Sequence, residues 1–309
     1  MKTTAHQPSD APSYFSAGLA ARTQAAEIEL NGSTVAYWTY EPVQATAETR
    51  TILVIHGFRG DHHGLLRVAD QLPEMRIVMP DLPGFGSSAA FAAGEHSVAQ
   101  YGTFISAFMA AVGLGADTVL LGHSFGSIVA AHFVADHPGE VTPLILINPI
   151  AAPALAGPKG IMTKLAVLYY RLAARLPHAL GLALLRSPLI IRVMSEAMAK
   201  TGSKDLRRFI HGQHHSYFSA FANRESLLES FTASVSGHVA EVAGKLTLPV
   251  LLVAGEKDEI ATLPDQHHLA TLLPDGVLKV IPGVGHLIHY ETPGPAAGFI
   301  RSFLKDHPA

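Results

Sequence analysis

Short apolar runs alternate with helical patterns along this chain, and that alternation limits the possible fold more than any other feature. The runs are Thr51–Ile55, Arg76–Met79, Thr118–Leu121, Leu144–Ile147, Val250–Ala254 and Val277–Ile281. The helical patterns are Leu65–Leu72, Ser97–Val112, Phe125–His137, Pro264–Leu273 and Pro295–Leu304. Strands that are apolar on both sides suit a parallel sheet covered by helices on both faces. The sequence therefore predicts an α/β fold with a doubly wound, mostly parallel sheet.

One long interval interrupts the alternation and indicates an insertion. Residues 151–246 show no strand signal, only helical periodicity broken at Pro177, Pro188 and Gly202. A structureless loop of that length is implausible inside a domain. We therefore expect a helical cap at 151–246, a core at 25–150 and 247–309, and an N-terminal extension at 1–24. The core should open with a hairpin, Ala26–Leu30 and Thr34–Tyr40, joined by Asn31-Gly32.

Composition excludes several classes of protein. Of 309 residues, 48% are apolar and 15% are charged, which excludes a disordered chain. The net charge of −3 provides no overall field for nucleic acid, and the absence of cysteine excludes disulfides and thiol nucleophiles. The first 24 residues lack the apolar stretch of a signal peptide, and no uninterrupted run of 18 apolar residues occurs. We expect a cytoplasmic protein without a spanning helix.

The sequence Gly122-His123-Ser124-Phe125-Gly126 lies between a predicted strand and a predicted helix. This G-x-S-x-G pattern, in a strand–turn–helix context, presents a serine hydroxyl on a sharp turn above the sheet. The flanking glycines allow close backbone approach, and the N-terminus of the following helix favours negative charge. Ser124 is therefore the candidate nucleophile.

A serine nucleophile needs a base, and the base needs an orienting carboxylate. Asp258 follows the strand Val250–Ala254, and His286 follows the strand Val277–Ile281, so the chain order is Ser, Asp, His. We assign His286 as the base and Asp258 as its orienting group. Glu256 and Glu259 are alternatives for the acid. The alternative base is His289. The end of the earlier strand Leu144–Ile147 could also carry the acid, but the residues there are Asn148-Pro149, which have no carboxylate.

An oxyanion hole needs two backbone N–H groups near the nucleophile. One is expected from Phe125, directly after Ser124, and the other from Phe58, in the turn His56-Gly57-Phe58-Arg59-Gly60 after a neighbouring strand. We expect His56 to hold this turn in place rather than to take part in catalysis.

Together these motifs resemble the α/β-hydrolase superfamily, in its serine-nucleophile branch with an HG-x oxyanion loop, a helical cap and esterase- and lipase-like members. The matching segments are His56-Gly57-Phe58, Asp81-Leu82-Pro83-Gly84-Phe85-Gly86-Ser87, Gly122–Gly126, Gly255 to Asp258, and Gly285-His286. The resemblance implies that Asp81 lies in a structural turn, and that neither a metal nor a cofactor is needed. Haloalkane dehalogenases and epoxide hydrolases use an aspartate nucleophile, so Ser124 disfavours both. The carbon–carbon bond hydrolases of aromatic degradation keep serine but typically have a longer Gly-rich loop and a G-N-S-M-G-G turn, which this chain lacks.

The predicted cap is rich in apolar residues interrupted by isolated bases. Ile161–Met198 contains 25 apolar residues out of 38, and its five bases (Lys164, Arg171, Arg175, Arg186, Arg192) face a single acid, Glu196. This pattern predicts a hydrophobic substrate and, as a further expectation, weak contact of the cap with a membrane surface. The histidine clusters at 62–63, 211–215 and 267–268 lack the spacing of a zinc site, so we interpret them as ordinary surface or core residues.

The sequence thus predicts a serine hydrolase that cleaves a carboxylic ester with a hydrophobic acyl or alcohol part through an acyl-enzyme. Carbon–carbon hydrolysis of a dienone acid stays open, because Arg59 beside the oxyanion loop could favour an acidic substrate. A protein of this fold that binds a small ligand without turning it over is the third hypothesis.

Overall fold

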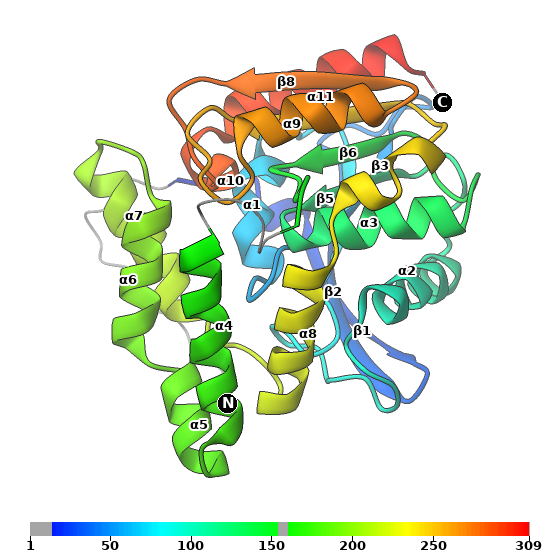
Figure 1. The fold of residues 1–309 in the computed structure, drawn as a ribbon. Coiled ribbons are helices and arrows are strands. Elements are labelled where there is room, and N and C mark those ends of the chain that lie inside the picture. Colours follow the sequence, from blue (N-terminus) through cyan, green and yellow to red (C-terminus); the bar gives the residue numbers. More distant parts are fainter. Residues whose placement is uncertain (1–13, 154–159, 309) are drawn as a thin grey trace.

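The computed structural model describes residues 14–153 and 160–308, which contain an eight-stranded sheet (Figure 1). Its strands are β1 (Thr23–Leu30), β2 (Ser33–Tyr40), β3 (Thr51–Ile55), β4 (Arg76–Pro80), β5 (Val119–His123), β6 (Leu144–Ile147), β7 (Val250–Gly255) and β8 (Gly276–Ile281). They are arranged in the order β1-β2-β4-β3-β5-β6-β7-β8. Only the β1–β2 and β2–β4 pairs are antiparallel. The predicted doubly wound, mostly parallel sheet is confirmed.

Helices cover both faces of the sheet and create two hydrophobic cores. One core lies under α2 (Val98–Val112), α3 (Phe125–Asp136) and α9 (Leu263–Leu272), and the other under α1 (His62–Asp70), α10 (Ile288–Glu291) and α11 (Pro293–Asp306). Within β3, Leu53 and Ile55 enter the first core, whereas Ile52 and Val54 enter the second. Successive side chains of a strand point to opposite faces, which explains why the inner strands are apolar at every position.

Five α-helices lie between β6 and β7 in the part of the chain that the structure describes, and we call them the cap. They are α4 (Gly160–Arg175), α5 (His178–Leu185), α6 (Pro188–Met198), α7 (Lys204–Tyr217) and α8 (Arg224–Ser236). In Figure 1, α4 to α7 extend to the lower left of the sheet, while α8 runs beside the core. Two short 3₁₀ turns, η2 (Val239–Glu241) and η3 (Ala243–Lys245), then lead back to the sheet. Residues 154–159 of the expected cap, and residues 1–13 of the expected extension, lie outside the described residues.

Several boundaries differ from those expected. Strand β1 begins at Thr23, so the last two residues assigned to the extension belong to the sheet. Helix α1 begins at His62 rather than Leu65, because the Asp61 side chain caps it by accepting a hydrogen bond from the His63 N–H at 2.9 Å. The cap also breaks between α7 and α8, where Ala220 and Ala222 form backbone hydrogen bonds with Gly86 and Gly84 of the core. The break therefore involves a distant segment as well as a local signal, the Asn223 side chain that caps α8 by accepting a hydrogen bond from the Ser226 N–H at 2.7 Å.

One stretch also differs from the expectation that no segment could span a membrane. Among the described residues, His178–Met198 is long and apolar enough to do so, judged by length and composition alone. In the structure this stretch is not a single helix. It divides at Arg186 and Ser187, between the end of α5 and the beginning of α6 at Pro188.

Candidate active site

Ser124 occupies a strained turn between β5 and α3. Its φ of 52° lies in the left-handed region, which serine rarely adopts. Two glycines make the turn possible: a Cβ on Gly122 would overlap the Gly126 carbonyl, and one on Gly126 would overlap the Ile55 carbonyl. Strain of this kind persists only where the surroundings enforce it, and it is common at functional sites.

Ser124, His286 and Asp258 form a continuous hydrogen-bonded chain. The Ser124 Oγ lies 2.8 Å from His286 Nε2, and His286 Nδ1 lies 2.7 Å from Asp258 Oδ2. Since an ionised carboxylate can only accept, we assign the proton to Nδ1, which leaves Nε2 as the acceptor for the serine hydroxyl. His286 and Asp258 are both buried, at 7% and 4% exposed, so water competes little for these bonds. The structure thus brings together the three side chains that were predicted from separate segments.

Asp258 is held by more groups than His286 alone. Its Oδ1 accepts hydrogen bonds from the Ile260 and Ala261 N–H groups at 2.8 and 3.0 Å, and its Oδ2 accepts one from Asn148 Nδ2 at 2.8 Å. Burial by itself raises the pKa of Asp258, but His286 and the backbone donors outweigh it and hold the pKa below its ordinary range. Asp258 is therefore ionised at neutral pH.

Asn148 is the site residue that sequence reasoning missed as a contributor. It is fully buried and has a φ of 46° at the end of β6, beside the strand that carries Asp258. Its place after a strand was visible in the sequence. Its left-handed backbone and the direction of its amide were not, and the sequence alone identifies it only as a residue that cannot supply an acid.

The two expected oxyanion donors are free to bind. Phe125 is the first residue of α3, and Phe58 follows Gly57, whose Cα lies so near the nucleophile that a Cβ there would be 3.2 Å from Ser124 Cβ. Within the described residues, neither the Phe58 nor the Phe125 N–H donates a hydrogen bond. Both amides are therefore available to a ligand, as an oxyanion hole would require.

Hydrogen bonds from His56 and from the turn that begins at Asp81 hold the oxyanion loop, residues 56–60, in place. His56 Nδ1 donates to the Gly57 carbonyl at 2.9 Å, and its Nε2 accepts from the Leu82 N–H at 2.8 Å. Burial lowers the pKa of His56, so the ring stays neutral and can both donate and accept. Asp81 is fully buried and accepts hydrogen bonds from His62 and from the Ser87 N–H. Both residues therefore shape the loop from outside the triad.

The alternative acids and base are engaged elsewhere. Glu256 accepts a hydrogen bond from the Gly283 N–H at 2.7 Å, and the exposed Glu259 pairs with Lys200 at 3.2 Å. His289 is buried against the ring of His123, at 4.2 Å between centroids, and burial lowers its pKa well below the ordinary value. Neither of its ring nitrogens is placed against Ser124 by a hydrogen bond.

Arg59 points into the cap. Its guanidinium donates to the Phe218 carbonyl (3.0 Å), the Tyr170 hydroxyl (3.1 Å) and the Leu185 carbonyl (2.6 Å), and the residue is 2% exposed. A substrate carboxylate therefore has no access to this cation, and the hypothesis that Arg59 favours an acidic substrate is wrong. Its role is to tie the oxyanion loop to α4, α5 and the α7–α8 break.

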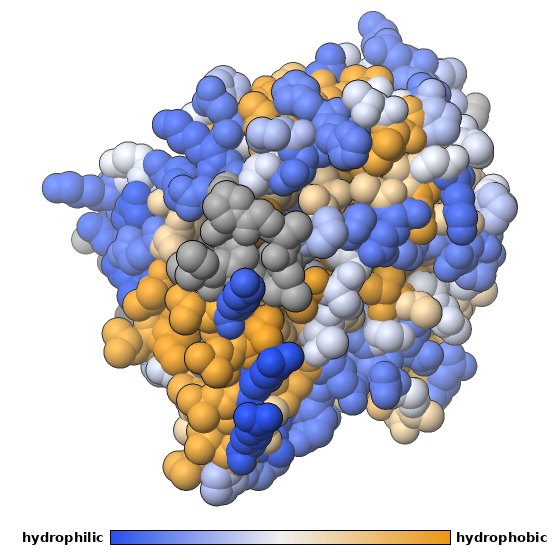
Figure 2. All heavy atoms as spheres, in the orientation of Figure 1, coloured by the Kyte–Doolittle hydropathy of each residue, from blue (hydrophilic) through white to orange (hydrophobic). Residues whose placement is uncertain are grey.

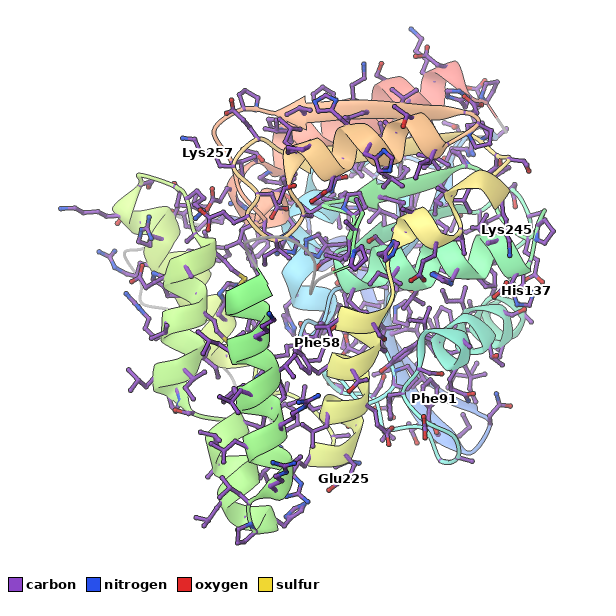
Figure 3. All side chains as sticks on the ribbon, viewed as in Figure 1. Phe58, Phe91, His137, Glu225, Lys245 and Lys257 are labelled. Atoms are coloured by element: carbon purple, nitrogen blue, oxygen red, sulfur yellow. The ribbon has the colours of Figure 1, made fainter. Side chains whose placement is uncertain are left out.

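The oxyanion loop is lined by aromatic rings. Phe58 lies between the cap helices and the sheet (Figure 3), with its ring about 6 Å from those of Phe85, Tyr170 and Phe231. Tyr170 of α4 and Phe231 of α8 stack on each other at 3.8 Å between centroids. The surroundings of the predicted oxyanion hole are thus largely apolar.

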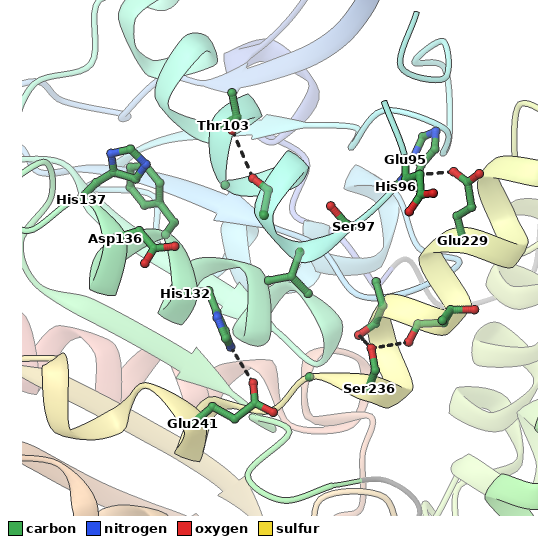
Figure 4. A pocket seen from close by; sticks show the side chains of 17 residues that line it. Glu95, His96, Ser97, Thr103, His132, Asp136, His137, Glu229, Ser236 and Glu241 are labelled. Atoms are coloured by element: carbon green, nitrogen blue, oxygen red, sulfur yellow. Dashed lines mark hydrogen bonds and ion pairs between the residues drawn. The ribbon is translucent and has the colours of Figure 1, made fainter. Parts of the chain in front are cut away.

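Two other features of the described residues lie apart from the triad. A groove of about 690 Å³ opens between α2, α3 and α8 and is lined by the carboxylates of Glu95, Asp136, Glu229 and Glu241 (Figure 4). Elsewhere, Asp61, His62 and His63 have ligand-type atoms within 4.8 Å of one another. The two rings stack on Trp38 and Tyr217 and bond through Nδ1 to Asp81 and Asp61, so these contacts account for their placement.

The strand order and a serine at the turn between β5 and α3 define an α/β hydrolase. The family model described as serine aminopeptidase, S33, matches residues 46–293, and the chain belongs to this family.

Individual relatives agree with this assignment. Lipase 3 of Moraxella sp. (strain TA144) is 23% identical over 264 residues, covering 82% of this chain and 76% of the lipase. Lipase 1 of Psychrobacter immobilis is 22% identical over 259 residues, with the same coverage. Among solved structures, an esterase from Exiguobacterium antarcticum superimposes with a TM-score of 0.73 at 17% identity, over 91% of this chain and 100% of the esterase. The protein is thus a hydrolase similar to lipases and esterases.

Proposed function

We propose that this protein hydrolyses carboxylic esters through a covalent acyl-enzyme formed on Ser124. The observation that carries the proposal is the unbroken chain from Ser124 Oγ through His286 to Asp258, with distances of 2.8 and 2.7 Å. Two unengaged amides belong to Phe125, the next residue after Ser124, and to Phe58, which follows the Gly57 that closely approaches Ser124. The names of the lipases and the esterase to which the chain is similar also support ester chemistry.

In the proposed reaction His286 Nε2 takes the hydroxyl proton as Ser124 Oγ attacks the ester carbonyl carbon. The Phe58 and Phe125 amides stabilise the oxyanion, while Asp258 stabilises the imidazolium. The intermediate collapses to an acyl-serine as His286 returns the proton to the departing alcohol. A water molecule, deprotonated by the same nitrogen, then attacks the acyl carbon. As this second intermediate collapses, the acid departs and His286 returns the proton to Ser124 Oγ.

We infer that the substrate has a hydrophobic acyl or alcohol part. The inference rests on the rings of Phe58, Tyr170, Phe231 and Phe85 around the oxyanion loop. Apolar walls with a few directed polar groups are typical of pockets for such ligands. Carbon–carbon hydrolysis of a dienone acid was suggested by Arg59 as a binding group for an acidic substrate. That support is lost, because the Arg59 guanidinium forms its hydrogen bonds with residues of the cap.

The test is a panel of p-nitrophenyl esters from acetate to decanoate, assayed with wild type and Ser124→Ala. We expect turnover by wild type with an optimum above acetate, and a loss of about 10⁴-fold or more in kcat for Ser124→Ala. An acetate optimum would argue against the hydrophobic substrate.

The matched control is Ser236→Ala, which removes an exposed hydroxyl of α8 that lies outside the triad. It should keep wild-type turnover. If wild type and Ser124→Ala release nitrophenol equally slowly while both are folded, the esterase proposal fails.

A further inference from the structure

The outer surface of the cap carries a concentration of exposed apolar side chains. Nine large apolar side chains are exposed in the described residues, and six of them belong to α4, α5 and α6. We call these six the outer cap face: Leu165, Leu168, Leu172, Leu180, Leu189 and Val193, each 50–73% exposed. Figure 2 shows this part of the molecule as a broad hydrophobic area over the cap helices. A contiguous apolar surface of this kind marks an interaction site.

The same helices pack onto the protein through their opposite sides. Helix α4 buries Tyr170 and Ala173, α5 buries Leu185, and α6 buries Ile191, each at 4% exposure or less. The outer cap face is therefore not the surface that attaches the cap to the core. Its apolar residues have no packing function within the described part of the chain.

A row of cations runs along this face. Lys164, Arg171 and Arg175 are exposed, and their spacing of seven and four residues puts them within about 40° of one another around α4. The leucines at 165, 168 and 172 lie on the adjacent strip of the same helix. None of the three bases forms an ion pair within the described residues. Figure 2 shows hydrophilic side chains running down the hydrophobic area.

The charge of the chain is unevenly distributed, and the segment that contains this face is positive. Residues 161–198 contain five bases and one acid, a net charge of +4, whereas the complete chain has −3. The remaining residues therefore carry −7. Such an asymmetry orients the molecule in the field of a negative surface, because the cap is attracted and the rest is repelled.

We propose that the outer cap face docks on the surface of an anionic lipid bilayer. Leucine side chains enter the headgroup–acyl boundary, and the Lys164, Arg171 and Arg175 side chains meet lipid phosphates. A second copy of the chain is a poorer occupant, since a symmetric contact would oppose the same unpaired cations. A bilayer of anionic lipid supplies both the apolar phase and the neutralising charge.

The contact is one in which helices lie on the membrane. The apolar stretch His178–Met198 is interrupted at Arg186 and Ser187, and its two helices bury Leu185 and Ile191 against the protein. Because α5 and α6 are held against the protein in this way, they present one side to the membrane surface and do not cross the bilayer. Docking would also place the bilayer against the outer side of α4. On the inner side of this helix, the Tyr170 hydroxyl accepts a hydrogen bond from Arg59 of the oxyanion loop.

The experiment measures vesicle binding by the full chain in a Ser124→Ala background, so that lipids stay intact and the result is independent of the proposed esterase activity. The vesicles are phosphatidylcholine alone, or phosphatidylcholine with about one third phosphatidylglycerol. We expect cosedimentation with the anionic vesicles, weakened by high salt. The variant Lys164→Glu/Arg171→Glu/Arg175→Glu should lose roughly 100-fold or more in affinity.

The matched control is Lys245→Glu/Lys279→Glu/Lys305→Glu. It changes the net charge equally at exposed lysines away from the cap, and none of these forms an ion pair within the described residues. This control should lose far less affinity than the cap variant. An apolar variant, Leu168→Ser/Leu189→Ser/Val193→Ser, should weaken binding at all salt concentrations. Circular dichroism verifies that each variant is folded.

Three outcomes overturn the proposal. The first is equal cosedimentation of wild type with neutral and anionic vesicles or with neither. The second is an equal loss of binding by the two charge variants. The third is a stable dimer in analytical ultracentrifugation that the apolar variant dissolves, because the outer cap face would then be an interface between copies of this chain.

Discussion

The role proposed for Ser124 depends on its surroundings, and each neighbour contributes a separate physical effect. The backbone holds it at a φ of 52°, and His286 and Asp258 align a proton acceptor with its hydroxyl. Asn148 adds a fourth hydrogen bond to Asp258 that no motif shows. These effects act on one hydroxyl, so under the proposed mechanism we expect the loss of any one of them to lower activity.

Arg59 is a positioning residue for the oxyanion loop. The variant Arg59→Met leaves the Phe218 and Leu185 carbonyls unpaired in the interior and removes the polar contacts that tie the loop beside Phe58 to the cap. We expect kcat for the best ester to fall by about 10–100-fold with a smaller change in KM, because misplacing an oxyanion donor affects the transition state more than binding. Steady-state kinetics on the ester panel measure the changes in kcat and KM separately.

The control for Arg59 is Arg186→Met. Both guanidinium groups lie near the ring of Phe221, at 5.7 and 4.9 Å from its centroid, but Arg186 is exposed and bonds to the Phe221 carbonyl. It should reduce stability slightly and leave kcat unchanged. Equal losses of kcat in the two variants would mean that the cap as a whole, and not Arg59, positions the loop.

At the scale of elements, the site depends on how closely α3 approaches the sheet. Gly126 lies in the first turn of α3, and a Cβ there would overlap the carbonyl oxygens of Ile55 and His56 at the end of β3. The helix can therefore begin directly above the strands only because this residue has no side chain.

We expect Gly126→Ala to lower the free energy of unfolding by about 3 kcal/mol, because backbone atoms must move to admit the methyl group. In contrast, Gly212→Ala, in the middle of α7 with no atom within 4 Å of the new Cβ, should stabilise the protein by about 0.5–1 kcal/mol. Urea unfolding measures both. Similar effects in the two variants would contradict the packing argument.

For the whole molecule, buried neutral histidines connect stability to pH. Burial lowers the pKa of His123 and of His214 to about 3, from the ordinary 6.5. Between these values the unfolded chain binds a proton that the folded protein does not, so stability falls as the pH falls. At pH 5 each residue costs about 2 kcal/mol. The pKa of Asp258 is lowered in the folded protein, so its stabilising contribution is complete above the unfolded pKa and is lost as the pH falls toward the folded pKa.

The test is His214→Gln, which removes one titrating ring and keeps a polar atom near Ser195 Oγ, the 2.7 Å partner of His214 Nδ1. The loss of unfolding free energy between pH 7 and pH 5 should shrink by about 2 kcal/mol, measured by urea unfolding at both values. The exposed His267→Gln is the control and should leave the pH dependence as in wild type. An unchanged dependence in His214→Gln would show that this ring does not titrate as described.

The sequence by itself determined the sheet and the order of Ser124, Asp258 and His286, because apolar runs and glycine turns are local signals. The tertiary structure decided the rest. The break between α7 and α8 exists because Ala220 and Ala222 bond to a turn more than 130 residues earlier. Asn148 contributes because β6 and β7 are neighbours in the sheet, and Arg59 serves the cap because three cap oxygens converge on it. A side chain's partner depends on which distant segments pack together, and a local pattern contains no record of that packing.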